Sequence, residues 1–369
     1  MAISIGYGRH RPLELSVGEL AGALGDSVTV LPIVIAVGTL SDYSLPGLLL
    51  GFAVFQVVWG LYYGAPVSVE PMKALAALAI AGALSAGQLA GAGLLAGAVL
   101  LVAGRTRTLG RIERAIGEPV VRGVQLAVAL VLAETGLRLG AEGVVVAVGA
   151  AAVVVVVTVL GYRRASALVV LALGLLAAGL QVGLPAPTVP SIALAVPEPS
   201  TVFAPSVLGA TAGQLAMTVA NAAVATSLLL SDLYDRDVTP DSLATSMGAM
   251  NLLAVPFGAM PMCHGSGGVA GKHAFGARTA GANVILGVLY AAAALLAVGL
   301  LVAFPLPALG VLLLVIAAEL GRASLDTSHL PVTLLVGVVG VATSVGLAFV
   351  AGLVVHLALE RRAEDAGSV

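Results

Sequence analysis

The chain changes character at Gly64-Ala65-Pro66-Val67-Ser68-Val69-Glu70-Pro71-Met72-Lys73, where two prolines and two ionisable side chains interrupt a hydrophobic segment. A second interruption lies at Met260-Pro261-Met262-Cys263-His264-Gly265-Ser266-Gly267-Gly268. Proline biases the residue before it toward extended backbone, and it is tolerated in the first turn of a helix. We therefore expect each stretch to run extended and then to begin a short helix. The first helix should start at Pro71 with Glu70 as its cap, and the second near Ser266.

Around these interruptions the chain has the composition of a membrane protein. Its 369 residues are 59% hydrophobic and 10% charged, with a mean hydropathy of +1.09, whereas soluble domains carry about 25% charged residues. Apolar runs such as 141–160 and 282–304 reach the roughly 20 residues that cross a bilayer. Continuous apolar runs favour helices over a β-barrel, whose strands alternate. We expect an all-α integral membrane protein.

The apolar runs predict about fourteen transmembrane segments. They lie near 13–39, 46–63, 66–84, 87–104, 117–136, 141–160, 164–184, 205–230, 241–257, 261–272, 279–303, 306–320, 328–342 and 344–360. The third and tenth contain the two interruptions. As an alternative, the last two segments form one bent hairpin or one long helix.

The basic residues predict the orientation of these segments. With the N-terminus inside, every Lys and Arg except Lys73 and Arg138 falls in an inside loop or tail, as the positive-inside rule requires. The basic stretch 105–122, Lys272 and Arg278 are explained in this way as topogenic. We expect a multi-pass protein of the cell membrane with both termini cytoplasmic. The expected organisation is a cytoplasmic N-terminus 1–12, a first repeat 13–184, an extracytoplasmic linker 185–204, a second repeat 205–360 and a cytoplasmic tail 361–369.

Several functional classes are excluded by composition. A net charge of −2 and the lack of a basic tract interleaved with aromatics argue against a nucleic-acid partner. The one cysteine, Cys263, excludes internal disulfides and any multi-cysteine metal site. Beyond Cys263 and His264 we find no nucleophile, base or ligand cluster, so we expect no enzyme, no cofactor and no metal. Residues 1–12 lack the apolar core of a signal peptide.

The two interruptions correspond under an internal repeat. A shift of 195 residues lays Pro66 on Pro261, Asp26 on Asn221, and the run 18–21 on 213–216. Seven segments per half is an odd number, so the halves insert in opposite orientations. Inverted repeats with broken helices at matching positions indicate the binding site of a transporter. The expected fold is therefore two inverted seven-segment repeats with half-helices at segments 3 and 10.

Two half-helices that begin near mid-membrane would form an anion site. Each N-terminus offers unpaired N–H groups and about half a positive charge; the alternative is a pair of simple kinks. An ionisable group within the membrane is costly and usually functional, so Lys73 is a candidate site residue. The alternative is that Lys73 forms a salt bridge with Glu70, Glu19 or Asp26. His264 is more readily explained as a packed, hydrogen-bonded histidine than as a metal ligand. Polar side chains that share helix faces, and that can also serve as interhelical contacts, are Glu19, Asp26 and Thr29, and Gln214, Thr218 and Asn221.

These motifs resemble those of the molybdate transporter family, distant kin of the SulP sulfate permeases. Residues 25–32 resemble its first-segment motif, 69–73 its P-V-Q-P-M-K element, and 257–268 with 275–278 its most distinctive signature. The resemblance implies a core-and-gate fold that carries a tetrahedral dianion between segments 3 and 10. SulP permeases carry a cytoplasmic regulatory domain after their last segment. Only nine residues follow Glu360 here, so the resemblance implies a transporter without that domain. Glu70 stands where the family has glutamine, and Val28 where it usually has glycine.

We therefore expect a secondary active transporter of molybdate or sulfate, coupled to protons and working by alternating access. Its partners would be a small inorganic oxyanion and the lipid bilayer, and a homodimer is left open. Alternatives are a nucleobase-type proton symporter of the same fold, in which Glu70 and His264 bind a neutral ring, and a passive anion channel. The expected proton-coupling residues are Glu70, Asp26 and Glu19. The expected substrate-binding residues are Ser68, Met72, Lys73, Gln214, Asn221, His264, Gly265, Ser266, Gly267 and Gly268.

Overall fold

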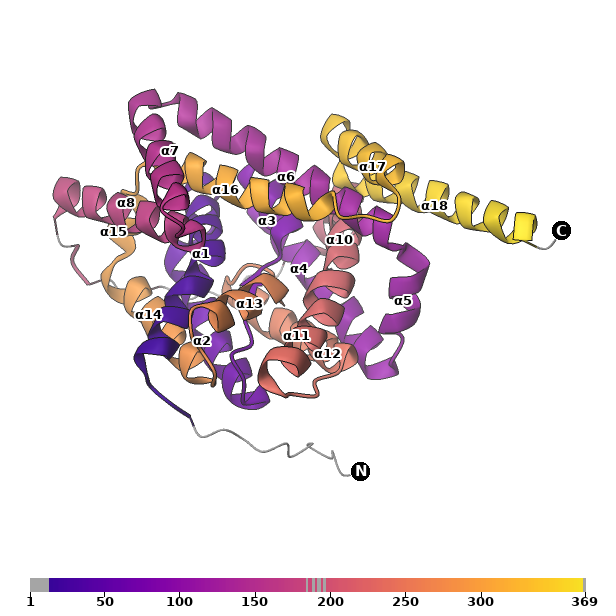
Figure 1. Cartoon of the computed structure of the whole chain (residues 1–369), viewed down its shortest axis with the longest axis horizontal. Helices are drawn as coiled ribbons and strands as arrows, with labels where there is room; N and C mark the ends of the chain where they lie inside the picture. Colours follow the sequence, from indigo (N-terminus) through magenta and orange to yellow (C-terminus); the bar gives the residue numbers. More distant parts are fainter. Residues whose placement is uncertain (1–12, 184, 188–189, 191–193, 195–196, 368–369) are drawn as a thin grey trace.

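The computed structural model describes residues 13–183, 185–187, 190, 194 and 197–367. These residues form helices and one two-stranded sheet (Figure 1). The expected cytoplasmic N-terminus 1–12 and seven of the twenty residues of the expected linker 185–204 lie outside the described residues. Seven of the described helices are long and apolar enough to cross a membrane, and three shorter apolar helices accompany them. The count of fourteen crossings stays a prediction.

The first half of the chain contains most of its long helices. Its elements are α1 (Val17–Leu40), α2 (Leu45–Tyr63), β1 (Val69–Pro71), α3 (Lys73–Ile80), α4 (Ala86–Thr106), α5 (Leu109–Ile116), α6 (Glu118–Ala141), α7 (Val144–Val159), η1 (Arg163–Ala165) and α8 (Ser166–Val182). Local sequence signals set several boundaries. Ser16 caps α1, and Ser85 with Gln88 forms a capping box at the start of α4. The short helix α5 lies where the sequence suggested only a basic loop.

The second half follows the same order. Its elements are α9 (Pro199–Val202), α10 (Pro205–Met217), the π-helical turn η2 (Thr218–Val224), α11 (Ala225–Tyr234), α12 (Pro240–Ala254), η3 (Val255–Phe257), β2 (Met262–His264), α13 (Ser266–Ala274), α14 (Gly281–Leu296), α15 (Val298–Val302), α16 (Leu306–Ser324), α17 (Leu330–Ala342) and α18 (Val345–Gly367). Proline begins α10 and α12, where its missing N–H has no helical partner to lose. The last two expected segments are separate helices, α17 and α18.

Two short strands meet at the centre of the fold. β1 and β2 pair antiparallel, with Val69 opposite His264 and Pro71 opposite Met262. Each strand leads into a short helix, α3 from the first half and α13 from the second. The predicted start of α13 at Ser266 is confirmed. The predicted start of α3 at Pro71 is wrong, because Pro71 is held in the strand; the helix begins at Lys73, with Met72 as its N-cap.

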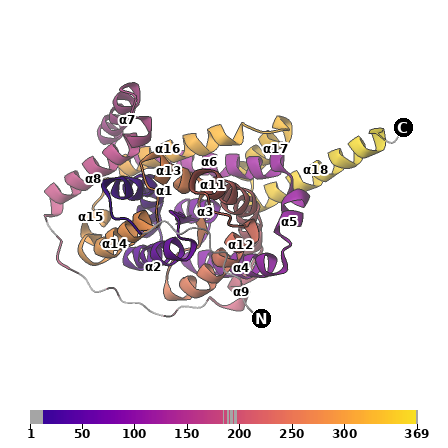
Figure 2. The same cartoon turned by 60° about the horizontal axis from the view of Figure 1, so that its bottom comes forward.

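The helices pack in two groups. We call α1–α4 and α10–α14 the core layer, and α6–α8 and α16–α18 the gate layer; α5 connects α4 of one to α6 of the other. Figure 1 shows α6, α16 and α17 along one side of the molecule and α2, α11 and α12 along the other. Figure 2, after rotation, shows α16 and α17 on one side and α2 and α12 on the other, with α18 extending away from the body. The layers meet where α3 and α10 pack on α6, and where α1 packs on α16.

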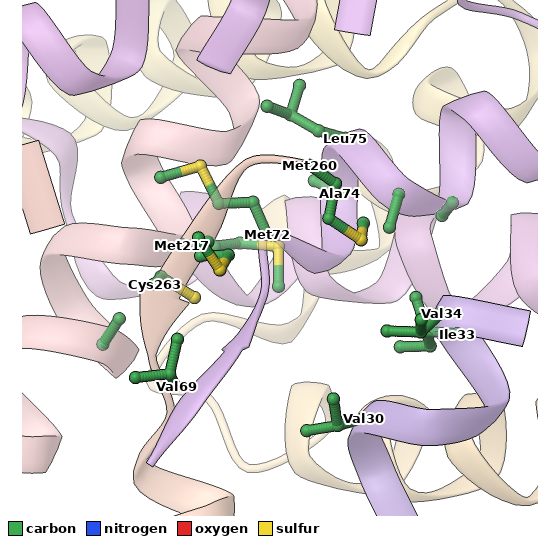
Figure 3. Close-up of a cluster of buried hydrophobic side chains, with 14 of the residues drawn as sticks. Val30, Ile33, Val34, Val69, Met72, Ala74, Leu75, Met217, Met260 and Cys263 are labelled. Atoms are coloured by element: carbon green, nitrogen blue, oxygen red, sulfur yellow. The ribbon is translucent and has the colours of Figure 1, made fainter. Parts of the chain in front are cut away.

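Buried methionines fill the space around the strand pair. Met72, Met217 and Met260 lie close to the junction between β1 and α3, with Cys263 beside them (Figure 3). Methionine adapts to irregular gaps, and the end of a strand beside two half-helices leaves such gaps. This packing surrounds the junction of β1 and α3 with apolar side chains.

Candidate anion-binding site

A cavity of about 410 Å³ lies between the core and gate layers. Seven of the ten expected substrate residues line it: Lys73, Gln214, Asn221, His264, Gly265, Ser266 and Gly267. Ser68, Met72 and Gly268 lie outside its lining. Asn221 belongs to the π-helical turn η2, a geometry that often marks functional sites. Thr29 of α1 completes the core side of the cavity.

The start of α13 supplies the positive end of a helix to this cavity. The N–H groups of Ser266, Gly267 and Gly268 precede the first intrahelical bond, which runs from Val269 N to Gly265 O at 3.1 Å. Gly268 N donates to Glu70 Oε1 at 2.7 Å. Ser266 and Gly267 are cavity residues. A helix start of this kind attracts anions.

The start of α3 is occupied by protein groups instead. Gln214 Oε1 accepts hydrogen bonds from Ala74 N at 2.9 Å and Leu75 N at 3.3 Å. Met72 N donates to Pro261 O at 2.9 Å. The Met72 amide, which we expected to bind the anion, is therefore engaged in this conformation. Gln214 acts here as a helix cap that joins the two repeats.

Glu70 and Lys73 form an ion pair at the wall of the cavity. The Glu70 side chain is fully buried, whereas that of Lys73 is 19% exposed and lines the cavity. The Glu70 carboxylate thus contacts both cationic elements of the site, the Lys73 ammonium and the N-terminus of α13. It sits where the charge of an incoming anion would also be favoured.

A second buried ion pair joins Asp26 of α1 to Lys272 of α13. Lys272 Nζ lies 3.1 Å from Asp26 Oδ2, and both side chains are fully buried. Lys272 Nζ also donates to Gln56 Oε1 and Asn283 Oδ1, each at 3.0 Å. Ser68 Oγ donates to Asp26 Oδ1 at 2.6 Å, so Ser68 faces this network and not the cavity. None of the five residues lines the cavity.

The topogenic interpretation of Lys272 is wrong, because the side chain lies inside the protein. A sequence signal was available: Lys272 follows Gly268 by one helical turn and so shares its face of α13. Glycine at 268 is required by close approach, since a Cβ there would collide with Asp26, Ser68 and Glu70. The face of α13 that carries both residues therefore packs against α1.

Glu19 caps the start of α14. Its Oε1 accepts from Arg278 N and Thr279 N, both at 2.8 Å, and its Oε2 accepts from Ala282 N at 2.9 Å. The side chain is buried. These three bonds connect α1 to α14 at a distance from the cavity lining, so we leave Glu19 out of the coupling proposal below.

His264 has both ring nitrogens in hydrogen bonds. Nδ1 lies 3.2 Å from Ser68 O, an acceptor, so this nitrogen carries the proton. Nε2 lies 2.8 Å from Ser246 Oγ. The rings of Trp59 and Tyr63 contact the imidazole edge to face. Within the described residues no group of three or more His, Cys, Asp and Glu could hold a metal ion.

The gate layer contributes residues that the sequence interpretation did not place in the site. Arg122 and Gln125 of α6 and Glu319 of α16 line the cavity opposite Lys73 and α13. Arg122 had been explained as part of a topogenic loop, and Gln125 and Glu319 carried no visible motif. Only the packing of α6 and α16 across the core layer identifies them.

Comparison with known proteins decides the family. The model of a family described as a molybdate transporter of the MFS superfamily matches this chain twice, at residues 18–132 and 206–320. The chain belongs to the molybdate transporter family. The double match falls on the two halves that the sequence shift had related.

Relatives in this family cover nearly the whole chain. Molybdate transporter 2 of Arabidopsis thaliana is 30% identical, over 95% of this chain and 89% of its own length. Molybdate transporter 1 of the same plant is 28% identical, over 93% and 88%. Molybdate transporter 1 of Chlamydomonas reinhardtii is 28% identical, over 83% of each.

Solved structures of anion transporters share the fold. The transmembrane domain of the cyanobacterial bicarbonate transporter BicA superposes with a TM-score of 0.65 at 15% identity, covering 91% of this chain and 96% of that one. SLC26A9 gives 0.71 at 12% identity, with 92% and 64% covered. Murine Slc26a9 in the inward-facing state gives 0.70 at 13%, with 97% and 70% covered. This molybdate transporter family member is a multi-pass membrane transporter and not an enzyme.

Proposed function

We propose that the protein is a secondary active transporter that moves a tetrahedral oxyanion, molybdate or sulfate, together with protons. The names of its relatives favour molybdate. The observation that carries the proposal is the Glu70 carboxylate, which bridges Lys73 and Gly268 N beside the cavity. A site built to bind an anion already holds an anionic side chain, so charge must be removed before a dianion enters.

Protonation of Glu70 provides that change. With Glu70 ionised, its charge cancels that of Lys73 and repels the substrate; two unit charges 4 Å apart interact by about 4 kcal/mol at an effective dielectric of 20. With Glu70 protonated, the Lys73 ammonium and the start of α13 are free to attract a dianion. In this proposal the anion binds between Ser266, Gly267 and Asn221 on the cavity wall.

A chain of cavities supports access from one side of the membrane. The central cavity shares Thr29, Gly267 and Glu319 with a neighbouring cavity of about 200 Å³. That cavity shares Arg164, Phe275 and Glu319 with a third, of about 620 Å³. The route ends at the α7–α8 loop, which the positive-inside rule assigns to the cytoplasm. We infer an inward-open conformation, which the core layer would leave by rocking against the gate layer.

Uptake into proteoliposomes tests this function. We expect radiolabelled molybdate to accumulate above its outside concentration when the outside is acidified, and a protonophore to abolish the accumulation. Lys73→Ala should abolish uptake. Because it leaves the buried Glu70 carboxylate without its ion-pair partner, the double variant Glu70→Gln with Lys73→Ala is tested beside it and should also fail to take up molybdate. Uptake that only equilibrates would indicate a passive channel. Competition by uracil or xanthine, without competition by tungstate, would indicate a nucleobase carrier instead.

A further inference from the structure

Arg122 lines the cavity from the gate layer. It lies on α6 opposite Lys73 and the start of α13, and its side chain is 25% exposed. Arg122 Nε lies 3.0 Å from Glu118 Oε1, and Nη1 donates to Gln125 Oε1 at 3.4 Å. These contacts use two of the five N–H groups of the guanidinium. The other three N–H groups have no hydrogen-bond partner among the described residues, and Arg122 is a cavity residue.

Glu118 holds the guanidinium in this place. Its Oε2 accepts hydrogen bonds from Ser328 N at 3.0 Å, Ser328 Oγ at 2.8 Å and Thr327 Oγ1 at 3.2 Å. Ser328 and Thr327 belong to the loop between α16 and α17. These hydrogen bonds therefore fix the Glu118 carboxylate of α6 against that loop. Glu118 therefore positions Arg122, and the pair moves with the gate layer when the layers move.

We propose that Arg122 contacts the substrate from the gate layer and selects for doubly charged anions. The inference rests on the function proposed above. A planar guanidinium matches the oxygen spacing of an oxyanion and forms strong charge-assisted hydrogen bonds. The Coulomb attraction between Arg122 and the anion doubles when the charge of the anion doubles. Selection by shape and size, in contrast, depends on all the residues that line the cavity. A dianion held by Lys73 on one side and Arg122 on the other also links the two layers.

Perrhenate and molybdate provide the probe, since both are tetrahedral oxyanions and they carry one and two negative charges. Calorimetric titration of the purified full chain with each anion gives an affinity ratio. We expect Arg122→Gln to lower the molybdate-to-perrhenate ratio by about tenfold or more, the worth of a charge-assisted hydrogen bond. Arg122→Lys should retain part of the charge preference. Arg111→Gln, on the exposed face of α5, is the matched control and should leave the ratio unchanged.

The outcomes separate this inference from the proposed function. If the wild-type protein binds none of molybdate, tungstate and sulfate, the proposed function fails. If the wild type binds molybdate but Arg122→Gln lowers the affinities for molybdate and perrhenate by the same factor, Arg122 has only a structural role and the inference is overturned. An unchanged ratio in a folded Arg122→Gln protein overturns it as well. A selective loss of dianion affinity supports it.

Discussion

The protein contains two ion pairs within its helical core, and they have different roles. Lys73 pairs with Glu70 at the edge of the cavity, so a ligand can reach it. Lys272 pairs with Asp26 in the interior, where its ammonium also donates to Gln56, Asn283 and the Val67 carbonyl. We therefore assign substrate chemistry to the first pair and the cohesion of α1 with α13 to the second.

Lys272→Met should destabilise the protein severely. The change leaves the Asp26 carboxylate buried without its partner, and breaking a buried pair in this way costs about 3–5 kcal/mol. Thermal unfolding in detergent measures the effect. The double variant Asp26→Asn with Lys272→Met should recover part of the loss, because it removes both charges. A single variant as stable as the wild type would show that the pair contributes nothing to folding.

At the scale of elements, the beginning of α13 is the decisive feature. Adjacent glycines there have opposite surroundings: a Cβ on Gly267 would meet nothing within 4 Å, whereas one on Gly268 would collide with three polar side chains. The first turn thus has one face open to the cavity and one packed against α1. This asymmetry permits a test with a single methyl group.

Gly267→Ala should fold normally and bind molybdate more weakly, because its methyl group enters the anion site. Gly268→Ala should lower thermal stability, because its methyl group displaces Asp26, Ser68 or Glu70. Titration and thermal unfolding of both variants measure the two effects. Equal stability and equal affinity for the two variants would contradict the described orientation of α13.

The sequence predicted the broken segments because prolines and glycines act locally on the backbone. Ser266 as the start of α13 follows from such local signals, and the shift between Pro66 and Pro261 indicated where the halves meet. The cap that Gln214 provides for α3, the burial of Lys272 and the cavity position of Arg122 were not predictable. Each depends on which side chain of another helix lies across the interface. Local sequence patterns do not show which residues of distant segments come into contact.

At the scale of the whole molecule, the two layers enclose a cavity whose charge can change. The core layer supplies Lys73, Glu70 and the start of α13, and the gate layer supplies Arg122. Glu70 contacts both core cations, and Glu319 of α16 adds a second carboxylate to the wall; we proposed above that protonation of Glu70 is the change that admits the anion. On the function proposed above, proton uptake by Glu70 would accompany anion binding, and this is the claim to be tested.

Proton uptake during binding tests this claim most directly. Calorimetric titration of the purified protein with molybdate, repeated in two buffers of different ionisation enthalpy, gives the number of protons taken up for each anion bound. We predict uptake of about one proton when Glu70 is ionised beforehand, and none in Glu70→Gln, which should still bind. Glu113→Gln on α5 serves as the control. Molybdate binding by the wild type without proton uptake, or equal uptake in Glu70→Gln, would contradict the account.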